Sequence, residues 1–327
     1  MNDKNRKKAK SSEPQKTSRN FGIGSRNMKR AGKLFSHESM RSFSTKGTLA
    51  DRWTVFAEWA KTERGISKME AITREVLIEY GHHLKNRIEL GNLQASTAQF
   101  YVSAVNSVMK TATKGGWDSV SPTKDCHIPK RNYIPKESKA MSESQHDKIA
   151  ELVCERIAVL MGLQRFMGLR FKESALLNAR LALRQGLSKG YAVISTGTKG
   201  GRKRNVPLNT DAKTMLERAV KIQDGRSLIP KDMTFVEFRR ECYATAIEHG
   251  FSFHPERHYY AQWRYQELVG VPACVNTTIP KKQWTDYLAE CLGVDTIQAA
   301  EIDNAARLKI SAELGHGRVE VTRVYLG

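Results

Sequence analysis

Residues 253–261 read FHPERHYYA, so that His254 and His258 bracket Arg257 within one short segment. Three further segments carry comparable groups: GLRFKESALL (168–177), TKGGRKRNVPL (198–208) and LGHGR (314–318), the last followed by Thr322 and Tyr325. Each is a weak signal alone, because an arginine opening a helix or a lysine in a basic turn is usually just a surface group. Their order along one chain is what suggests a common site.

The composition favours a protein that binds a polyanion. The chain has 327 residues, with 54 Lys and Arg against 34 Asp and Glu, which gives a net charge of +20. Such a surplus points first to nucleic acid, and an anionic membrane surface is the weaker alternative. The longest apolar stretch, residues 157–163, is too short to span a bilayer, and no secretory signal follows Met1. Five scattered cysteines without CxxC spacing favour the reducing cytoplasm.

Periodicity and composition divide the chain into four parts. Residues 1–45 are predicted to form a basic, flexible N-terminal arm that either contacts phosphates or only adds solubility. Residues 46–116 show helical spacing of apolar residues and predict a small all-α domain. Residues 117–142 contain three prolines and no periodicity, which indicates an interdomain linker. Residues 143–327 are mostly helical.

The last part also contains a predicted β-hairpin over residues 191–208, whose turn carries Lys199, Arg202 and Lys203. The fold class is therefore mainly α with a small β-sheet. In the preceding helical domain, Lys110 and Lys114 lie off the apolar stripes. They either face DNA or form an ordinary solvated surface, and the sequence leaves both readings open.

Motifs for metals and nucleotides are missing from the sequence. It has no GxxxxGK[ST] loop, no zinc spacing among its histidines and cysteines, and no carboxylate cluster for two magnesium ions. We therefore expect no metal and no cofactor. DNA cleavage by such a chain needs a protein nucleophile, cations on the phosphate oxygens and a proton donor for the leaving oxygen. Arginine suits the phosphate, lysine or histidine suits proton transfer, and a tyrosine attacks when cations stabilise its phenolate.

The four segments resemble the signature of the tyrosine recombinases, a family of site-specific recombinases that includes the phage integrases. That signature is an arginine in GLRxxE, a lysine in a β-hairpin turn, HxxRH, and LGHxxxxxTxxY. The resemblance covers residues 142–327. It implies a mixed α+β catalytic domain preceded by a helical, SAM-like core-binding domain, which together clamp duplex DNA.

The resemblance also implies roles for individual residues. Arg170 and Arg257 would hold the scissile phosphate, and Tyr325 would attack it to form a 3′-phosphotyrosyl link. Lys199, rather than Lys203, would protonate the leaving 5′-oxygen. The remaining implied roles are assistance in proton transfer and phosphate contact (His254, His316), support of the site (Glu173, His258) and DNA contact from the hairpin turn (Arg202, Lys203).

The implied function is integration or excision of a phage or other mobile element, without metal or ATP. The partners would be double-stranded DNA with specific sites, a homotetramer on paired sites, and accessory DNA-bending or directionality proteins, in the cytoplasm of a bacterium, associated with the nucleoid. Two alternatives remain open at this stage: a type IB topoisomerase, and a catalytically silent DNA-binding accessory protein.

The chain departs from the family pattern in three places. Pro255 and Glu256 replace the usual aspartate-plus-apolar pair. An extra segment, roughly residues 271–301, lies between Arg257 and His316 and is either a contact for protein or DNA or a passive insertion. The sequence ends at Gly327, so we expect protomers to contact one another through a surface other than a C-terminal tail.

Overall fold

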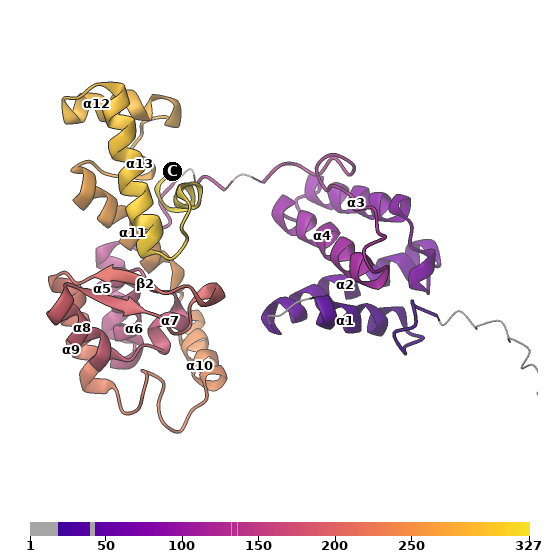
Figure 1. Ribbon diagram of the computed structural model, residues 1–327, viewed down its shortest axis with the longest axis horizontal. Coiled ribbons are helices and arrows are strands. Elements are labelled where there is room, and N and C mark those ends of the chain that lie inside the picture. The colour runs from indigo at the N-terminus through magenta and orange to yellow at the C-terminus, as the bar shows by residue number, and fades with distance from the viewer. Residues whose placement is uncertain (1–18, 40–42, 132, 136) are drawn as a thin grey trace, which may run out of the picture. The chain divides into compact units, whose positions relative to one another are not determined.

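The computed structural model describes residues 19–39, 43–131, 133–135 and 137–327. Contacts divide the chain into two compact units, residues 1–131 and 132–327 (Figure 1). Within the described residues, the N-terminal unit is entirely helical. Its elements are α1 (Met28–Ser39), α2 (Phe43–Arg64), the 3-10 turn η1 (Met69–Ala71), α3 (Arg74–Glu89) and α4 (Ala95–Ala112).

The core of the N-terminal unit forms around Trp53 of α2, which is fully buried. Its indole lies against Gly32 of α1, where even a Cβ atom would come within 2.0 Å of the ring. The indole nitrogen donates a hydrogen bond to the carbonyl of Met28 at 3.1 Å. Glycine at position 32 therefore allows α1 and α2 to pack closely.

The arm predicted for residues 1–45 is too long. Residues 28–39 form α1, in which Met28, Ala31 and Phe35 are buried against the rest of the unit. Their spacing of three to four residues is that of a helix face, but the basic residues between them masked it. Residues 1–18 lie outside the described residues.

The linker predicted for residues 117–142 is also too long. Val120, Cys126 and Ile128 are buried in the N-terminal unit. Asn106 of α4 holds this segment, because its side-chain oxygen accepts hydrogen bonds from the Trp117 indole at 2.8 Å and from the Val120 amide at 3.0 Å. The chain leaves the N-terminal unit only after residue 131.

The C-terminal unit combines helices with one two-stranded sheet. Strand β1 pairs antiparallel with β2, and Ile194 lies opposite Arg204. This confirms the predicted fold class, mainly α with a small sheet. The regular elements are α5 (Glu143–Leu152), α6 (Glu155–Met167), α7 (Phe171–Ala175), α8 (Ala179–Lys189), β1 (Tyr191–Ile194), β2 (Arg204–Pro207), α9 (Thr210–Ile222), α10 (Phe235–Glu248), α11 (His254–Val269), α12 (Trp284–Leu292), α13 (Thr296–Glu313) and α14 (Arg323–Leu326). The 3-10 turns are η2 (Lys199–Gly201), η3 (Cys274–Asn276), η4 (Lys281–Gln283) and η5 (Val319–Thr322).

Helix α6 lies at the centre of this unit and is buried along most of its length. It packs against α9 on one side and α11 on another, while α13 runs beside α11 (Figure 1). The segment 271–301 folds as η3, η4, α12 and the start of α13, with Trp284 and Leu288 buried. In the ranges that the structure describes, no helix is long and apolar enough to cross a membrane.

Candidate active site

Arg257 forms the centre of the candidate site. It lies in the first turn of α11, which also contains Pro255, a residue well suited to a helix start because its nitrogen has no hydrogen to leave unpaired. The side chain is 1% exposed. Its guanidinium donates to the carbonyl of Gly168, to the carbonyl of Leu314 at 2.5 Å, and to the hydroxyl of Tyr325 at 3.3 Å. These contacts join the GLR segment, the HxxR segment and the C-terminal segment around one cation.

Gly168 makes this approach possible. It ends α6 in the left-handed region, with φ at 59°. A Cβ at this position would lie 2.5 Å from the ring of Tyr260 on α11. The glycine in the GLR motif therefore serves both the turn and the contact between α6 and α11.

Tyr325 points its hydroxyl into the same site. Besides the bond from Arg257, the hydroxyl lies 3.3 Å from Nε2 of His316. The same nitrogen lies 3.2 Å from the Arg257 guanidinium, which can only donate, so Nε2 acts as an acceptor. The tyrosine ring packs against His258, with ring centroids 4.7 Å apart, and the side chain is 4% exposed. The tyrosine near the end of the sequence is thus ordered and enclosed.

Arg170 is held beside this group by Glu173. The Glu173 carboxylate is fully buried and accepts from the Arg170 backbone amide at 2.7 Å and from its guanidinium at 2.8 Å. Arg204 on β2 completes the cluster with two bonds to the same carboxylate, at 2.9 and 2.7 Å. Burial would raise the pKa of Glu173, but the bonds from Arg204 and Arg170 outweigh it and hold that pKa below its usual value. Glu173 therefore stays charged and fixes two arginines.

Burial and neighbouring positive groups lower the pKa of each histidine in the site. Burial is the largest cause, and the positive charges of Arg257 and Arg170 add to it. Together they lower the pKa of His316 to about 3 and also lower that of His254. Burial, followed by His254, lowers the pKa of His258 to about 4. The three imidazoles are consequently neutral at pH 7, and the positive charge of the site resides on its arginines.

The hairpin turn lies close to the LGH segment. The Arg202 guanidinium donates to the carbonyl of His316 at 3.2 Å. Lys199 is exposed, and its charge contributes to the depressed pKa of His316. Lys203 is exposed in the same turn. Lys110 and Lys114, the other predicted DNA contacts, are exposed in the N-terminal unit, the first in the last turn of α4 and the second two residues after its end.

The Pro255-Glu256 departure creates a buried ionic cluster beneath the site. Glu256 is fully buried, and its carboxylate lies 2.9 Å from Arg165 on α6 and 2.6 Å from Nδ1 of His146 on α5. The Arg165 guanidinium also lies over the ring of Tyr259, 3.3 Å from its centroid. The cluster ties the first turn of α11, which carries His254 and Arg257, to two other helices.

Replacing Glu256 with glutamine is expected to lower the free energy of unfolding by about 3–5 kcal/mol, because it leaves Arg165 as a buried charge without a counter-ion. Chemical denaturation measures this change. Glu267→Gln on the same helix is the matched control, because Glu267 is 45% exposed in its pair with Arg264 and should cost under about 1 kcal/mol. Equal stability losses in the two variants would contradict a structural role for the cluster.

The buried His258 makes the fold sensitive to acid. Its pKa is about 4 in the folded chain, against about 6.5 for an unfolded histidine. Between these values the unfolded chain binds a proton that the folded chain does not, so stability falls as the pH drops from 6.5 to 4. The expected loss from this residue is about 3 kcal/mol. We expect His258→Phe to flatten the pH dependence of unfolding by this amount, and an unchanged pH dependence would contradict the assignment.

Sequence reasoning missed three residues that support the site. Arg204 donates a hydrogen bond to Glu173. The one feature that could have indicated this is its place in β2, where buried and exposed side chains alternate and position 204 is buried. Glu313 accepts from Arg264 at 3.0 Å and from the hydroxyl of Tyr260 at 2.9 Å. Gln262 donates to the backbone carbonyl of Tyr325 at 3.0 Å. Within the described ranges, no group of three or more histidine, cysteine or acidic side chains is arranged to hold a metal ion.

Comparisons with known proteins find chains of similar fold. Residues 135–263 match a family model described as Integrase. The chain is similar to the Tn1549 transposon integrase in complex with circular intermediate DNA, at 13% identity and a TM-score of 0.57, over 93% of this chain and 96% of that one. It is also similar to a lambda integrase dimer bound to a COC′ core site, at 17% identity and a TM-score of 0.51, over 84% and 93% of the two chains. A lambda integrase tetramer bound to a Holliday junction gives 16% identity and a TM-score of 0.50, over 85% and 76%. No curated protein sequence matches the chain.

Proposed function

We propose that this chain is a tyrosine recombinase, which recombines double-stranded DNA by using Tyr325 as the nucleophile. The observation that carries the assignment is the position of the Tyr325 hydroxyl, 3.3 Å from both Arg257 and His316. The arginine stabilises negative charge on the phenolate oxygen, and His316 Nε2, the acceptor that faces the hydroxyl, takes up the phenol proton.

The scissile phosphate binds between Arg170 and Arg257, whose guanidinium groups neutralise its non-bridging oxygens. The Tyr325 oxygen attacks phosphorus, the P–O5′ bond breaks, and a 3′-phosphotyrosyl link forms. Lys199 donates a proton to the departing 5′-oxygen, and His254 contacts the phosphate. The 5′-hydroxyl of another strand then reverses these steps. The phosphoester bond is conserved throughout, so exchange requires no ATP.

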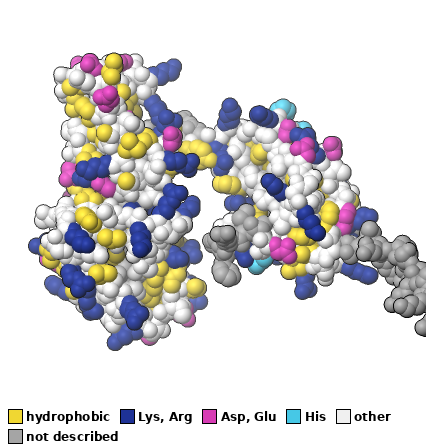
Figure 2. All heavy atoms as spheres, viewed as in Figure 1, with side chains coloured by type: hydrophobic (Ala, Val, Ile, Leu, Met, Phe, Trp, Pro, Cys, Tyr) yellow, Lys and Arg dark blue, Asp and Glu magenta, His cyan; other side chains and the backbone are white. Residues whose placement is uncertain are grey.

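The DNA partner is supported by the charge of the chain and by the relatives. Lys and Arg side chains are spread over the visible face of each unit (Figure 2), in a chain of net charge +20. The Tn1549 and lambda integrases named above are bound to DNA, one of them as a tetramer on a Holliday junction. By analogy, four copies of this chain act on paired sites, with Lys110, Lys114, Arg202 and Lys203 among the DNA contacts. The reaction integrates or excises a mobile element in the bacterial cytoplasm.

A plasmid assay tests this function against a topoisomerase. Plasmids carrying two copies, one copy or no copy of the junction from the element that encodes this chain are incubated with protein and EDTA. A recombinase gives products of rearranged length only from the two-site plasmid. Relaxation of all three plasmids, without rearrangement, would instead identify a type IB topoisomerase.

A further inference from the structure

The segment that carries the nucleophile is anchored by residues outside the four motifs, and one of them is Arg307. We propose that Arg307, together with the turn η3, positions Tyr325 for attack, and that the extra segment 271–301 serves as support for the nucleophile. The proposal rests on the function proposed above.

Two buried hydrogen bonds hold the backbone, one at the nucleophile and one two residues after it. Gln262 of α11 donates to the carbonyl of Tyr325 at 3.0 Å, and Arg307 of α13 donates to the carbonyl of Gly327 at 3.2 Å. Helix α14 spans only four residues, Arg323–Leu326. A helix of one turn has no stability of its own, so its position depends on such contacts.

Arg307 is itself held in a fixed orientation. Its Nε donates to the carboxylate of Asp303 at 2.7 Å, and its side chain is 8% exposed. The same carboxylate accepts from the hydroxyl of Tyr265 on α11 and from the indole of Trp284 at 3.4 Å. Trp284 opens α12 within the extra segment. Because the guanidinium is planar, the bond to Asp303 also directs the nitrogen that reaches Gly327.

The turn η3 closes against the end of α14. A Cβ at Gly327 would lie 3.1 Å from the amide nitrogen of Val275 and 3.5 Å from the Cβ of Cys274. Leu326 is fully buried. The residues of η3 therefore touch the chain immediately after the nucleophile, which gives the extra segment a role other than a passive insertion.

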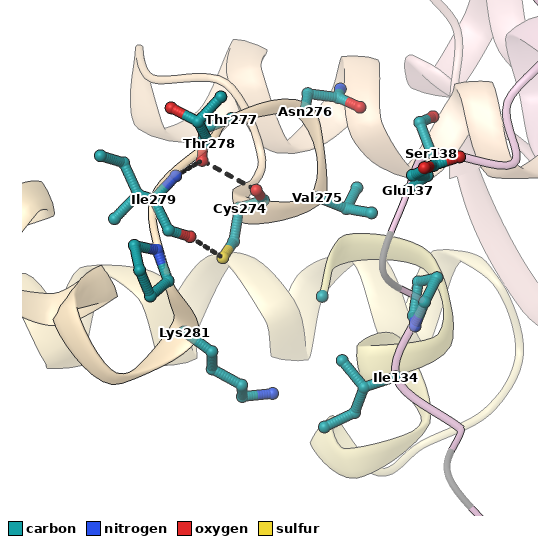
Figure 3. Close-up of a pocket in the computed structure, with 13 residues that line it drawn as sticks. Ile134, Glu137, Ser138, Cys274, Val275, Asn276, Thr277, Thr278, Ile279 and Lys281 are labelled. Carbon is teal, nitrogen blue, oxygen red and sulfur yellow. Dashed lines mark hydrogen bonds between the residues drawn. The ribbon is translucent and has the colours of Figure 1, made fainter.

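On one side of this turn the packing is open. A pocket of about 790 Å³ lies between the loop 274–281 and residues 134, 135, 137 and 138, with Gly327 in its wall (Figure 3). Ser138, at the edge of this pocket, donates to the side-chain oxygen of Gln262 at 2.8 Å.

Loss of the Arg307 hydrogen bond to Gly327 should slow the attack of Tyr325 on the phosphate. Its effects on folding and on DNA binding should be smaller. Covalent attachment needs the tyrosine oxygen in line with phosphorus, and a displacement near 1 Å costs about 100-fold in rate. We expect Arg307→Leu to slow attachment between about 10-fold and 100-fold. Arg307→Lys, which keeps one donor and the charge, should recover part of that rate.

The experiment measures single-turnover attachment to a nicked duplex, with DNA affinity and the thermal midpoint measured for each variant. Lys309→Leu is the matched control, because Lys309 is exposed on the same helix and should react at the wild-type rate. A second readout uses the Tyr325→Phe background, where hydroperoxide replaces the missing phenol as nucleophile. Adding Arg307→Leu should leave that hydroperoxide cleavage unchanged.

The outcomes separate the two proposals. Slow attachment with unchanged affinity and unchanged hydroperoxide cleavage supports positioning by Arg307. Attachment at the wild-type rate overturns the positioning role and leaves the proposed function intact. Equal loss of covalent attachment and of hydroperoxide cleavage also overturns the positioning role, because Arg307 would then support the whole fold. Failure of the wild-type chain to form any adduct contradicts the proposed function itself, and the role of Arg307 with it.

Discussion

Replacing Tyr325 with phenylalanine is expected to abolish the covalent protein–DNA adduct completely and to leave DNA binding unchanged. The substitution removes only the hydroxyl oxygen that lies 3.3 Å from Arg257 and from His316. The ring keeps its packing against His258, so the fold should lose no more than about 1 kcal/mol for the missing hydrogen bond. A gel run in SDS detects the adduct, and a native mobility shift measures binding.

Tyr243→Phe is the matched control for this substitution. Tyr243 lies on α10 and is 40% exposed, so removal of its hydroxyl should change neither adduct formation nor binding. An adduct that persists in the Tyr325→Phe variant would show that another residue is the nucleophile. Loss of DNA binding in that variant would make Tyr325 a structural residue.

The second large effect is expected at Arg257. Lysine at this position keeps a positive charge but cannot reach the Gly168 carbonyl, the Leu314 carbonyl and the Tyr325 hydroxyl together. It also loses the forked geometry that holds two phosphate oxygens. We expect Arg257→Lys to slow attachment by about 10²–10³-fold, the usual effect of removing one preorganised donor to a developing anion.

Single-turnover attachment to a nicked duplex measures this loss, and thermal unfolding reports the accompanying structural cost. Arg218→Lys is the control, because the Arg218 side chain is 37% exposed in its pair with Glu155. We expect that variant to react at the wild-type rate. Attachment by Arg257→Lys within a few-fold of wild type would remove Arg257 from the phosphate site.

Local sequence patterns accounted for the parts of the fold that depend on short-range order. The β-prone segments on either side of Gly200 and Gly201 predicted the hairpin that the structure contains. The helical spacing of apolar residues likewise predicted α3, and the Thr73 side chain caps the start of this helix. The motif residues Arg257, His316 and Tyr325 could be grouped because their spacing resembles that of a known family.

Contacts between residues far apart in the sequence could not be predicted from such patterns. The burial of Val120, Cys126 and Ile128 depends on Asn106 and on Gly81, where the missing side chain leaves room for Cys126. Helix α1 was hidden because basic residues fill the positions between its apolar ones. The pairing of Arg204 with Glu173, and of Arg307 with Gly327, follows from tertiary packing alone.

The central claim, attack by Tyr325 to give a 3′-phosphotyrosyl link, is tested most directly by trapping that link and mapping it. A duplex from the element junction is nicked close to the scissile phosphate, so that the short downstream piece diffuses away after cleavage. One preparation is labelled at the 5′ end of the upstream piece and another at the 3′ end of the downstream piece, both with EDTA present. We predict an SDS-resistant adduct that carries only the upstream label and yields a Tyr325 peptide joined to a 3′-phosphate. An adduct carrying the downstream label, or one joined to another residue, would contradict it.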